Sequence, residues 1–132
     1  MSVEVKNLSW EINSKKILDD ISLSISSGEI ITILGPNGAG KSSFLKIISG
    51  DLQCTEGQVY FDQSNLDDIS IQDRSFIRSV MSQSQDVVYD FSTREIIEMG
   101  WLGRGISSYS DDFNLAIDQI SEECSVKNLL EQ

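Results

Sequence analysis

The chain has 132 residues and contains no histidine, only two cysteines and a single proline. The missing histidine excludes any site that uses an imidazole as general base or as metal ligand. Cys54 and Cys124 lie far apart in the sequence, and we expect two reduced thiols rather than a disulfide framework. Ten basic residues stand against 21 acidic ones, giving a formal net charge of −11. A field of that sign repels phosphate backbones, so generic nucleic-acid binding is disfavoured.

Long hydrophobic runs are also missing. No apolar stretch approaches the roughly 20 residues that a membrane-spanning helix requires. The chain does not open with a basic segment followed by a long apolar one, so we expect no signal peptide. With 39% hydrophobic and 23% charged residues, the composition is typical of a soluble globular protein. We therefore expect a cytosolic chain with a packed core, which leaves a membrane-embedded partner open.

The first part of the chain is expected to be rich in strands. Residues 3–5 alternate apolar and charged side chains, and residues 17–25 do the same with serines, which predicts strands with one wet face in an antiparallel sheet. Residues 30–34 are apolar nearly throughout and rich in isoleucine, which is typical of a central, buried strand. A further strand is expected at 58–61 and a short one at 79–81.

Helices are expected after the first strands and dominate the last third. The spacing predicts helices over 41–49, with Gly50 as stop signal, and over 70–78. Ser92 followed by Glu95 has capping-box spacing, and a further helix is expected after Ser110. The buried stripe of that last helix is expected to comprise Phe113, Ile117 and Ile120. Residues 100–110 read as a glycine- and serine-rich loop, and 126–130 as the start of another helix.

The stretch GPNGAGKSS, residues 35–43, fits the pattern G-x-x-x-x-G-K-[ST] without a gap. It also lies in the expected context, between an apolar strand and a helix. Glycines allow backbone N–H groups to turn toward one point, where together with the helix N-terminus they form an anion cradle. A chance glycine-rich turn is the alternative, but the flanking strand and helix make a coincidence improbable. The sequence therefore predicts a site for a nucleoside triphosphate.

At these residues the chain resembles the ABC-type ATPases, whose phosphate-binding loop usually reads GPNGAGKST. The resemblance extends to LSWEINSKKILDDISLSISSGEIITIL (8–34), LKIISGDLQCTEGQVYF (45–61) and SVMSQSQ (79–85). FSTREIIEMG (91–100) is similar to a helix entry of importers of iron-siderophores, haem and cobalamin. The resemblance implies an α/β fold of the P-loop NTPase type: an antiparallel β subdomain, an incomplete parallel core sheet and the start of a helical subdomain.

The resemblance also implies roles for individual residues. Lys41 would reach the β- and γ-phosphates, Ser42 would coordinate Mg²⁺, and Ser43 would touch a phosphate. Gln83 would contact Mg²⁺ and water and would bridge to the transmembrane partner. At the position where relatives stack an aromatic ring on adenine, this chain has Ile12; stacking by Trp10, two residues earlier, and an ordinary half-buried strand tryptophan are the alternatives there. The residues implied to bind ATP are Gly35, Pro36, Asn37, Gly38, Ala39, Gly40, Lys41, Ser42, Ser43 and Ile12.

The function implied is that of an ATP-binding subunit of an ABC importer for haem or iron chelates. Its partners would be a transmembrane permease and a second ATP-binding subunit, with no nucleic acid involved. It would lie in the cytoplasm, peripheral on the inner face of the plasma membrane. The alternatives are a catalytically dead nucleotide-binding remnant and a soluble ABC ATPase not tied to transport. For Trp101 two roles remain as alternatives, contact with a membrane partner and packing in the core.

Several parts that such an ATPase needs are not in the sequence. It has no LSGG string, no apolar strand that ends in Asp-Glu and no histidine. We therefore expect the N-terminal part of an ATPase, inactive by itself, with Gln83 as the only hydrolytic residue present and no complete catalytic set. The expected domains are a partial nucleotide-binding core with the phosphate loop (1–81), a Q-loop (82–91) and a partial helical subdomain (92–132). Without further strands, residues 30–34 should expose apolar surface.

Overall fold

The computed structural model describes residues 1–81, 83, 90–100 and 110–131. The chain forms two compact units, Met1–Val80 and Met81–Gln132, each with its own internal packing. The functional division into 1–81, 82–91 and 92–132 stays a prediction. Within the described residues, no helix combines the length and apolar character needed to cross a membrane.

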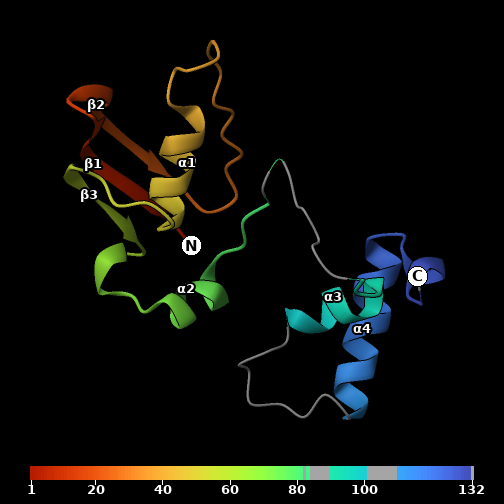
Figure 1. Cartoon of the computed structure of the whole chain (residues 1–132). Helices are drawn as coiled ribbons and strands as arrows, with labels where there is room; N and C mark the ends of the chain where they lie inside the picture. The colour runs from red at the N-terminus through yellow and green to blue at the C-terminus, as the bar shows by residue number, and fades with distance from the viewer. Residues whose placement is uncertain (82, 84–89, 101–109, 132) are drawn as a thin grey trace. The chain divides into compact units, whose positions relative to one another are not determined.

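The first unit is built on a four-stranded antiparallel sheet with the order β2-β1-β3-β4 (Figure 1). The strands are β1 (Val3–Ile12), β2 (Lys15–Ile25), β3 (Glu56–Phe61) and β4 (Ser64–Asn65). The antiparallel pairing of β1 with β2 and of β1 with β3 confirms the predicted antiparallel strands, which are longer than expected. The sheet provides the support on which the glycine-rich loop and its helix are placed.

The hairpin between β1 and β2 turns through Asn13 and Ser14, whose φ angles of 49° and 60° are those of the two-residue turn that suits a twisted hairpin. Further along, the register shifts between Val5 and Leu8. Asn7 and Asp20 both have a φ of 47°, and Asn7 Nδ2 donates to Asp20 Oδ1 at 2.8 Å. The two strands are therefore bent at an irregularity that this side-chain bond holds in place.

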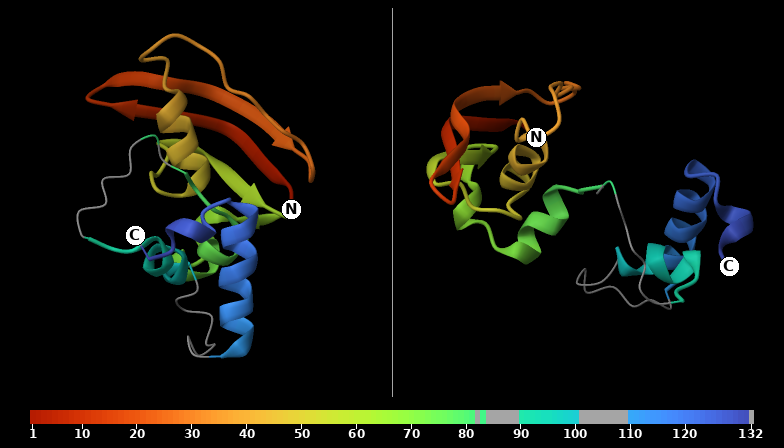
Figure 2. Two further views of the ribbon diagram at one scale, coloured as in Figure 1. Left: turned by 90° about the vertical axis from the view of Figure 1, so that its right-hand side faces the viewer. Right: turned by 45° about the horizontal axis from the view of Figure 1, so that its top comes forward.

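Helix α1 (Lys41–Ser49) lies across one face of the sheet (Figure 2). Phe44 and Ile47 on its inner side belong to one buried cluster with strand residues. That cluster comprises Val5, Leu8, Leu18, Phe44, Ile47, Val59, Phe61 and Leu66. The helix spans the predicted residues and ends at Gly50, which has a left-handed φ of 79° as predicted for a stop signal. Burial of Phe44 and Ile47 fixes the helix, and with it the loop that precedes it.

Two predicted strands do not form. Residues 30–34 belong to no strand, and Ile30, Ile31 and Leu34 are 94%, 52% and 87% exposed. Residues 79–81 are likewise outside any strand. A strand is held by hydrogen bonds to neighbours, and among the described residues no parallel partner is present for either segment. The exposure of the apolar run confirms the expectation that it would show its surface when unpaired.

The remaining helices follow their sequence signals. In the first unit, the short 3₁₀ turn η1 (Leu66–Asp68) precedes α2 (Ile71–Ile77). The second unit holds α3 (Thr93–Met99), α4 (Asp111–Glu123) and the 3₁₀ turn η2 (Lys127–Leu129). Both halves of the predicted capping box, Ser92 and Glu95, are formed at the start of α3.

The buried side of α4 differs from the prediction at one position. Phe113 and Ile117 are 1% exposed as predicted, but Ile120 is 39% exposed and Ser121 is fully buried in its place. A step of four residues continues the stripe to Ser121, and its hydroxyl donates to the Asp118 carbonyl at 2.8 Å, so the polar group is buried with a partner. Both cysteines are free thiols, as expected, and burial raises the pKa of Cys54.

Candidate phosphate-binding site

The loop of residues 35–40 runs directly into α1, and Gly40 is the residue at the junction. Gly40 has a φ of 87°, a conformation that favours glycine. A Cβ at this position would lie 2.8 Å from Leu18 Cδ2 and 3.0 Å from Ile17 Cγ2. The second strand thus packs against the loop so closely that a larger residue would force these β2 side chains to shift. Glycine at this position of the motif is favoured both by the backbone conformation and by the contact with β2.

The first turn of α1 offers backbone donors. The bond that begins the helix runs from the Phe44 N–H to the Gly40 carbonyl at 2.8 Å. The N–H groups of Lys41, Ser42 and Ser43 come before this first helical hydrogen bond in the chain. Among the described residues, no side chain caps this end of the helix. Helix N-termini carry a partial positive charge and unsatisfied N–H groups, so this end of α1 is suited to an anion.

Lys41 lies at the start of the helix and folds back over the loop. Its Nζ donates to the carbonyl oxygens of Gly35 and Pro36, both at 2.8 Å. The ammonium therefore already lies on the loop's own side of the helix. Ser42 is exposed and Ser43 half-buried, while residues 35–39 are exposed. The structure thus brings together the uncapped first turn of α1, one ammonium and two hydroxyls, groups that suit a polyphosphate with a bound divalent cation.

The two candidates for contact with the base lie near the end of β1 and differ in exposure. Trp10 packs against the buried cluster as a half-buried strand residue and pairs with Leu18 across the hairpin. Ile12 is 48% exposed and pairs with Lys15 beside the turn. The register shift between Trp10 and Glu11 interrupts the regular strand pairing between these two residues. Of the two, Ile12 is the residue whose side chain is more open to a ligand.

The remaining predicted residues lie in the second unit or outside the described part. Gln83 is exposed and belongs to the second unit. The rest of the predicted Q-loop up to residue 89, and Trp101 with most of the 100–110 loop, lie outside the described residues. Across the described ranges, no group of three or more carboxylates and thiols is placed to hold a metal ion.

Sequence reasoning missed Arg74 and Arg78, which contact the other end of α1. Neither belongs to a motif, and an arginine in a polar helix is usually solvated. The signal that could have found them is their spacing: two arginines four residues apart lie on one face of a helix. A second signal is the open carbonyls that every helix C-terminus leaves, which cations stabilise.

The chain is similar to known proteins over most of its length. The profile of the family described as ABC transporter matches residues 18–132. The hemin import ATP-binding protein HmuV of Nitrobacter winogradskyi is 35% identical over 119 residues, which cover 90% of this chain and 44% of that protein. The protein of the same name from Escherichia coli O157:H7 is 37% identical over 98 residues, 74% of this chain and 38% of its own length. The chain thus spans less than half the length of these relatives.

A solved structure shares the fold. A nucleotide-free ATP-binding cassette from an ABC transporter superposes with a TM-score of 0.82 at 23% identity. The superposition covers 100% of this chain and 57% of that one. At this level of identity the likeness concerns the fold, and it confirms the predicted fold class.

Proposed function

The chain belongs to the ABC transporter family, and from this we propose that it binds ATP with Mg²⁺ as the ATP-binding part of an importer. The observation that carries the proposal is the junction of loop and helix: a first turn of α1 that no side chain caps, with the Lys41 ammonium folded onto the same loop. In this assignment the amides of residues 40–43 hold phosphate oxygens, and Lys41 exchanges its carbonyl partners for the β- and γ-phosphates.

The Mg²⁺ contacts we propose are the Ser42 hydroxyl and the Gln83 amide oxygen. Ser42 is exposed at the first turn of α1, in reach of solvent and of a phosphate-bound cation. The bound cation would neutralise charge on the phosphates, which is what it supplies to phosphoryl transfer. Support for Gln83 comes from the family membership and from its exposure. Ile12 is proposed as the apolar contact of the adenine.

For the substrate class we propose haem or an iron chelate. The support is that relatives named hemin import ATP-binding protein match 90% and 74% of this chain. The partners would then be a transmembrane permease and a second ATP-binding subunit, and the chain would lie on the cytoplasmic side of the membrane. Recovery of such a permease with the chain from detergent-solubilised membranes tests this part. A soluble ABC ATPase not tied to transport would bring down no membrane protein.

Binding and turnover need separate tests. Calorimetric titration of the 132-residue chain with Mg-ATP and with Mg-tripolyphosphate separates phosphate binding from recognition of the base. The proposal requires saturable binding of both ligands, and heat indistinguishable from dilution for both would overturn it. We further propose that hydrolysis by this chain alone stays at background, because its residues include no signature string and no Asp-Glu strand end. Turnover well above background would contradict that part and leave the binding proposal standing.

A further inference from the structure

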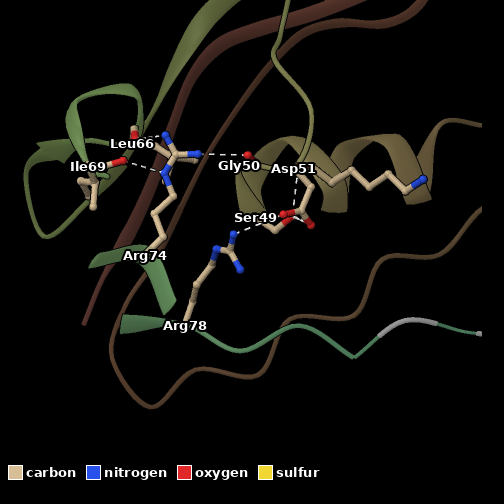
Figure 3. Close-up of polar contacts among 8 residues, drawn as sticks. Ser49, Gly50, Asp51, Leu66, Ile69, Arg74 and Arg78 are labelled. Atoms are coloured by element: carbon tan, nitrogen blue, oxygen red, sulfur yellow. Dashed lines mark hydrogen bonds and ion pairs between the residues drawn. The ribbon is translucent and has the colours of Figure 1, made fainter. Parts of the chain in front are cut away.

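The C-terminal end of α1 is held by a side chain from α2. The helix ends at Ser49, and Gly50 follows with its own N–H bonded back into the last turn. The Gly50 carbonyl accepts a hydrogen bond from Arg74 Nη1 at 3.0 Å (Figure 3). Carbonyls at a helix C-terminus carry partial negative charge, so a guanidinium is a favourable partner there. The φ of 79° at Gly50 favours glycine, and a Cβ there would lie 2.6 Å from Arg74 Nη1, so the guanidinium would have to shift.

Arg74 ties three segments together. Besides Gly50, its Nη2 donates to the Leu66 carbonyl and its Nε to the Ile69 carbonyl, both at 2.8 Å (Figure 3). The acceptors belong to the end of α1, the start of η1 and the residue just before the cap of α2. Because a guanidinium presents its donors in a rigid planar fork, these bonds fix the position and the rotation of α2 relative to α1.

Arg78 forms a second and looser connection. It is the residue that ends α2, and its Nη2 contacts Asp51 Oδ1 at 3.3 Å. The other carboxylate oxygen of Asp51 accepts from the Ser49 hydroxyl at 2.8 Å, so the link reaches the last residue of α1. The Arg78 Nε is buried, and the described residues offer it no acceptor. The contact of Arg78 with Asp51 is thus longer and less supported than the three bonds of Arg74.

We propose that Arg74 and Arg78 are positioning residues that fasten α2, and the residues that follow it up to Val80, to the C-terminal end of the phosphate-binding helix. The proposal rests on the proposed function, in which phosphate binds at the opposite end of α1. A ligand that restrains the N-terminal turn restrains the whole nine-residue helix, because Phe44 and Ile47 hold it in the core. The three hydrogen bonds of Arg74 are the firmer attachment between α2 and α1, and the Asp51–Arg78 ion pair is the weaker one.

Hydrogen exchange of the 132-residue chain with and without Mg-ATP tests the proposal. In the parent chain, Mg-ATP should slow the exchange of amides in residues 71–81 by about threefold or more, since local opening there becomes costlier. Arg78→Gln should keep the ATP affinity within about threefold but reduce that slowing, and Asp51→Asn should behave alike. The matched control is Arg94→Gln in α3, whose guanidinium bonds Glu98 and Asn114 in the second unit. It should keep the parent's response in residues 71–81.

The outcomes separate the two proposals. Absence of calorimetric binding by the parent overturns the proposed function, and the inference with it. Binding without slower exchange in residues 71–81, or unchanged slowing in both Arg78→Gln and Asp51→Asn, overturns the inference alone. Arg74→Lys supplies a further readout: one ammonium replaces a fork that made three bonds, so the exchange of residues 66–77 should speed up even without ATP. Should that variant fail to fold, the Arg78 and Asp51 variants decide the matter.

Discussion

The Nζ atom of Lys41 lies 2.8 Å from the carbonyl oxygen of Gly35, so the ammonium at the start of α1 closes over the loop that precedes it. Lys41→Ala removes this cation from the loop. We expect the affinity for Mg-ATP to fall by about tenfold or more, because a charge-assisted contact to phosphate is lost. Lys46→Ala, an exposed lysine near the other end of the same helix, should leave the affinity within about twofold. Calorimetry of both variants makes the comparison, and equal losses would refute the assignment.

Gly40 and Gly38 offer a matched pair, because both have left-handed φ angles but only Gly40 is crowded. Gly38→Ala should cost about 1 kcal/mol from backbone strain alone, since no atom lies within 4 Å of its added Cβ. Gly40→Ala should cost about 2–4 kcal/mol, because the Cβ would also press against Leu18 and Ile17. Urea unfolding measures both free energies. A Gly40 variant as stable as the Gly38 variant would contradict the close packing of β2 against the loop.

The proposed contact between Ile12 and the adenine can be tested by placing an aromatic ring at this position. If the adenine lies against Ile12, then Ile12→Tyr should strengthen ATP binding by about 1 kcal/mol through stacking. Binding of tripolyphosphate should not change, because that ligand has no base. Ile71→Tyr, at an isoleucine that is 83% exposed, is the control for a surface tyrosine. A gain for both ligands, or for neither, would remove Ile12 from the site.

Two isoleucines in the first unit have opposite environments. Ile47 is 2% exposed within the core, so Ile47→Ala should lower the free energy of unfolding by about 2–5 kcal/mol. Ile30 is 94% exposed, so Ile30→Ala should change it by less than about 0.5 kcal/mol. The same urea experiment serves for both. A large cost at Ile30 would mean that residues 30–34 are buried in the folded chain.

The capping box of α3 predicts a pH dependence. The backbone N–H of Ser92 and then its hydroxyl hold the pKa of the Glu95 carboxyl below its ordinary value. A depressed pKa means that the cap contributes stability above the ordinary glutamate pKa of about 4.3, and that this contribution is lost as the pH falls through the folded pKa. NMR titration of the Glu95 carboxyl should show a higher pKa in Ser92→Ala, which keeps the backbone donor but loses the hydroxyl. An unchanged pKa would show that the hydroxyl bond is not populated.

The features that the sequence predicted correctly depend on neighbours along the chain. Helix α1 with its stop at Gly50, the capping box at Ser92 and the alternation of β2 each depend on residues a few positions apart. The loop motif was visible for the same reason, since its glycines, Lys41 and Ser42 are contiguous.

The features that were missed depend on partners distant in sequence. Residues 30–34 have the composition of a buried strand, but a strand forms only where a neighbour offers hydrogen bonds. Ile120 was chosen for its apolar side chain, while the position on α4 that faces inward belongs to Ser121. The contacts of Arg74 with Gly50 and Leu66 join segments that no local pattern connects.

The bend at Asn7 and Asp20 has a consequence for how the molecule behaves at high concentration. Strand β2 is an edge of the sheet among the described residues, and it carries Lys15, Lys16, Asp19 and Asp20 in its first half. A kinked and charged edge strand is a poor template for another chain, so edge-to-edge pairing of sheets is disfavoured along these residues. Aggregation of this protein should therefore start at other parts of the chain. Mutations that straighten this part of β2 or remove its charges should make it able to pair with the edge of another sheet.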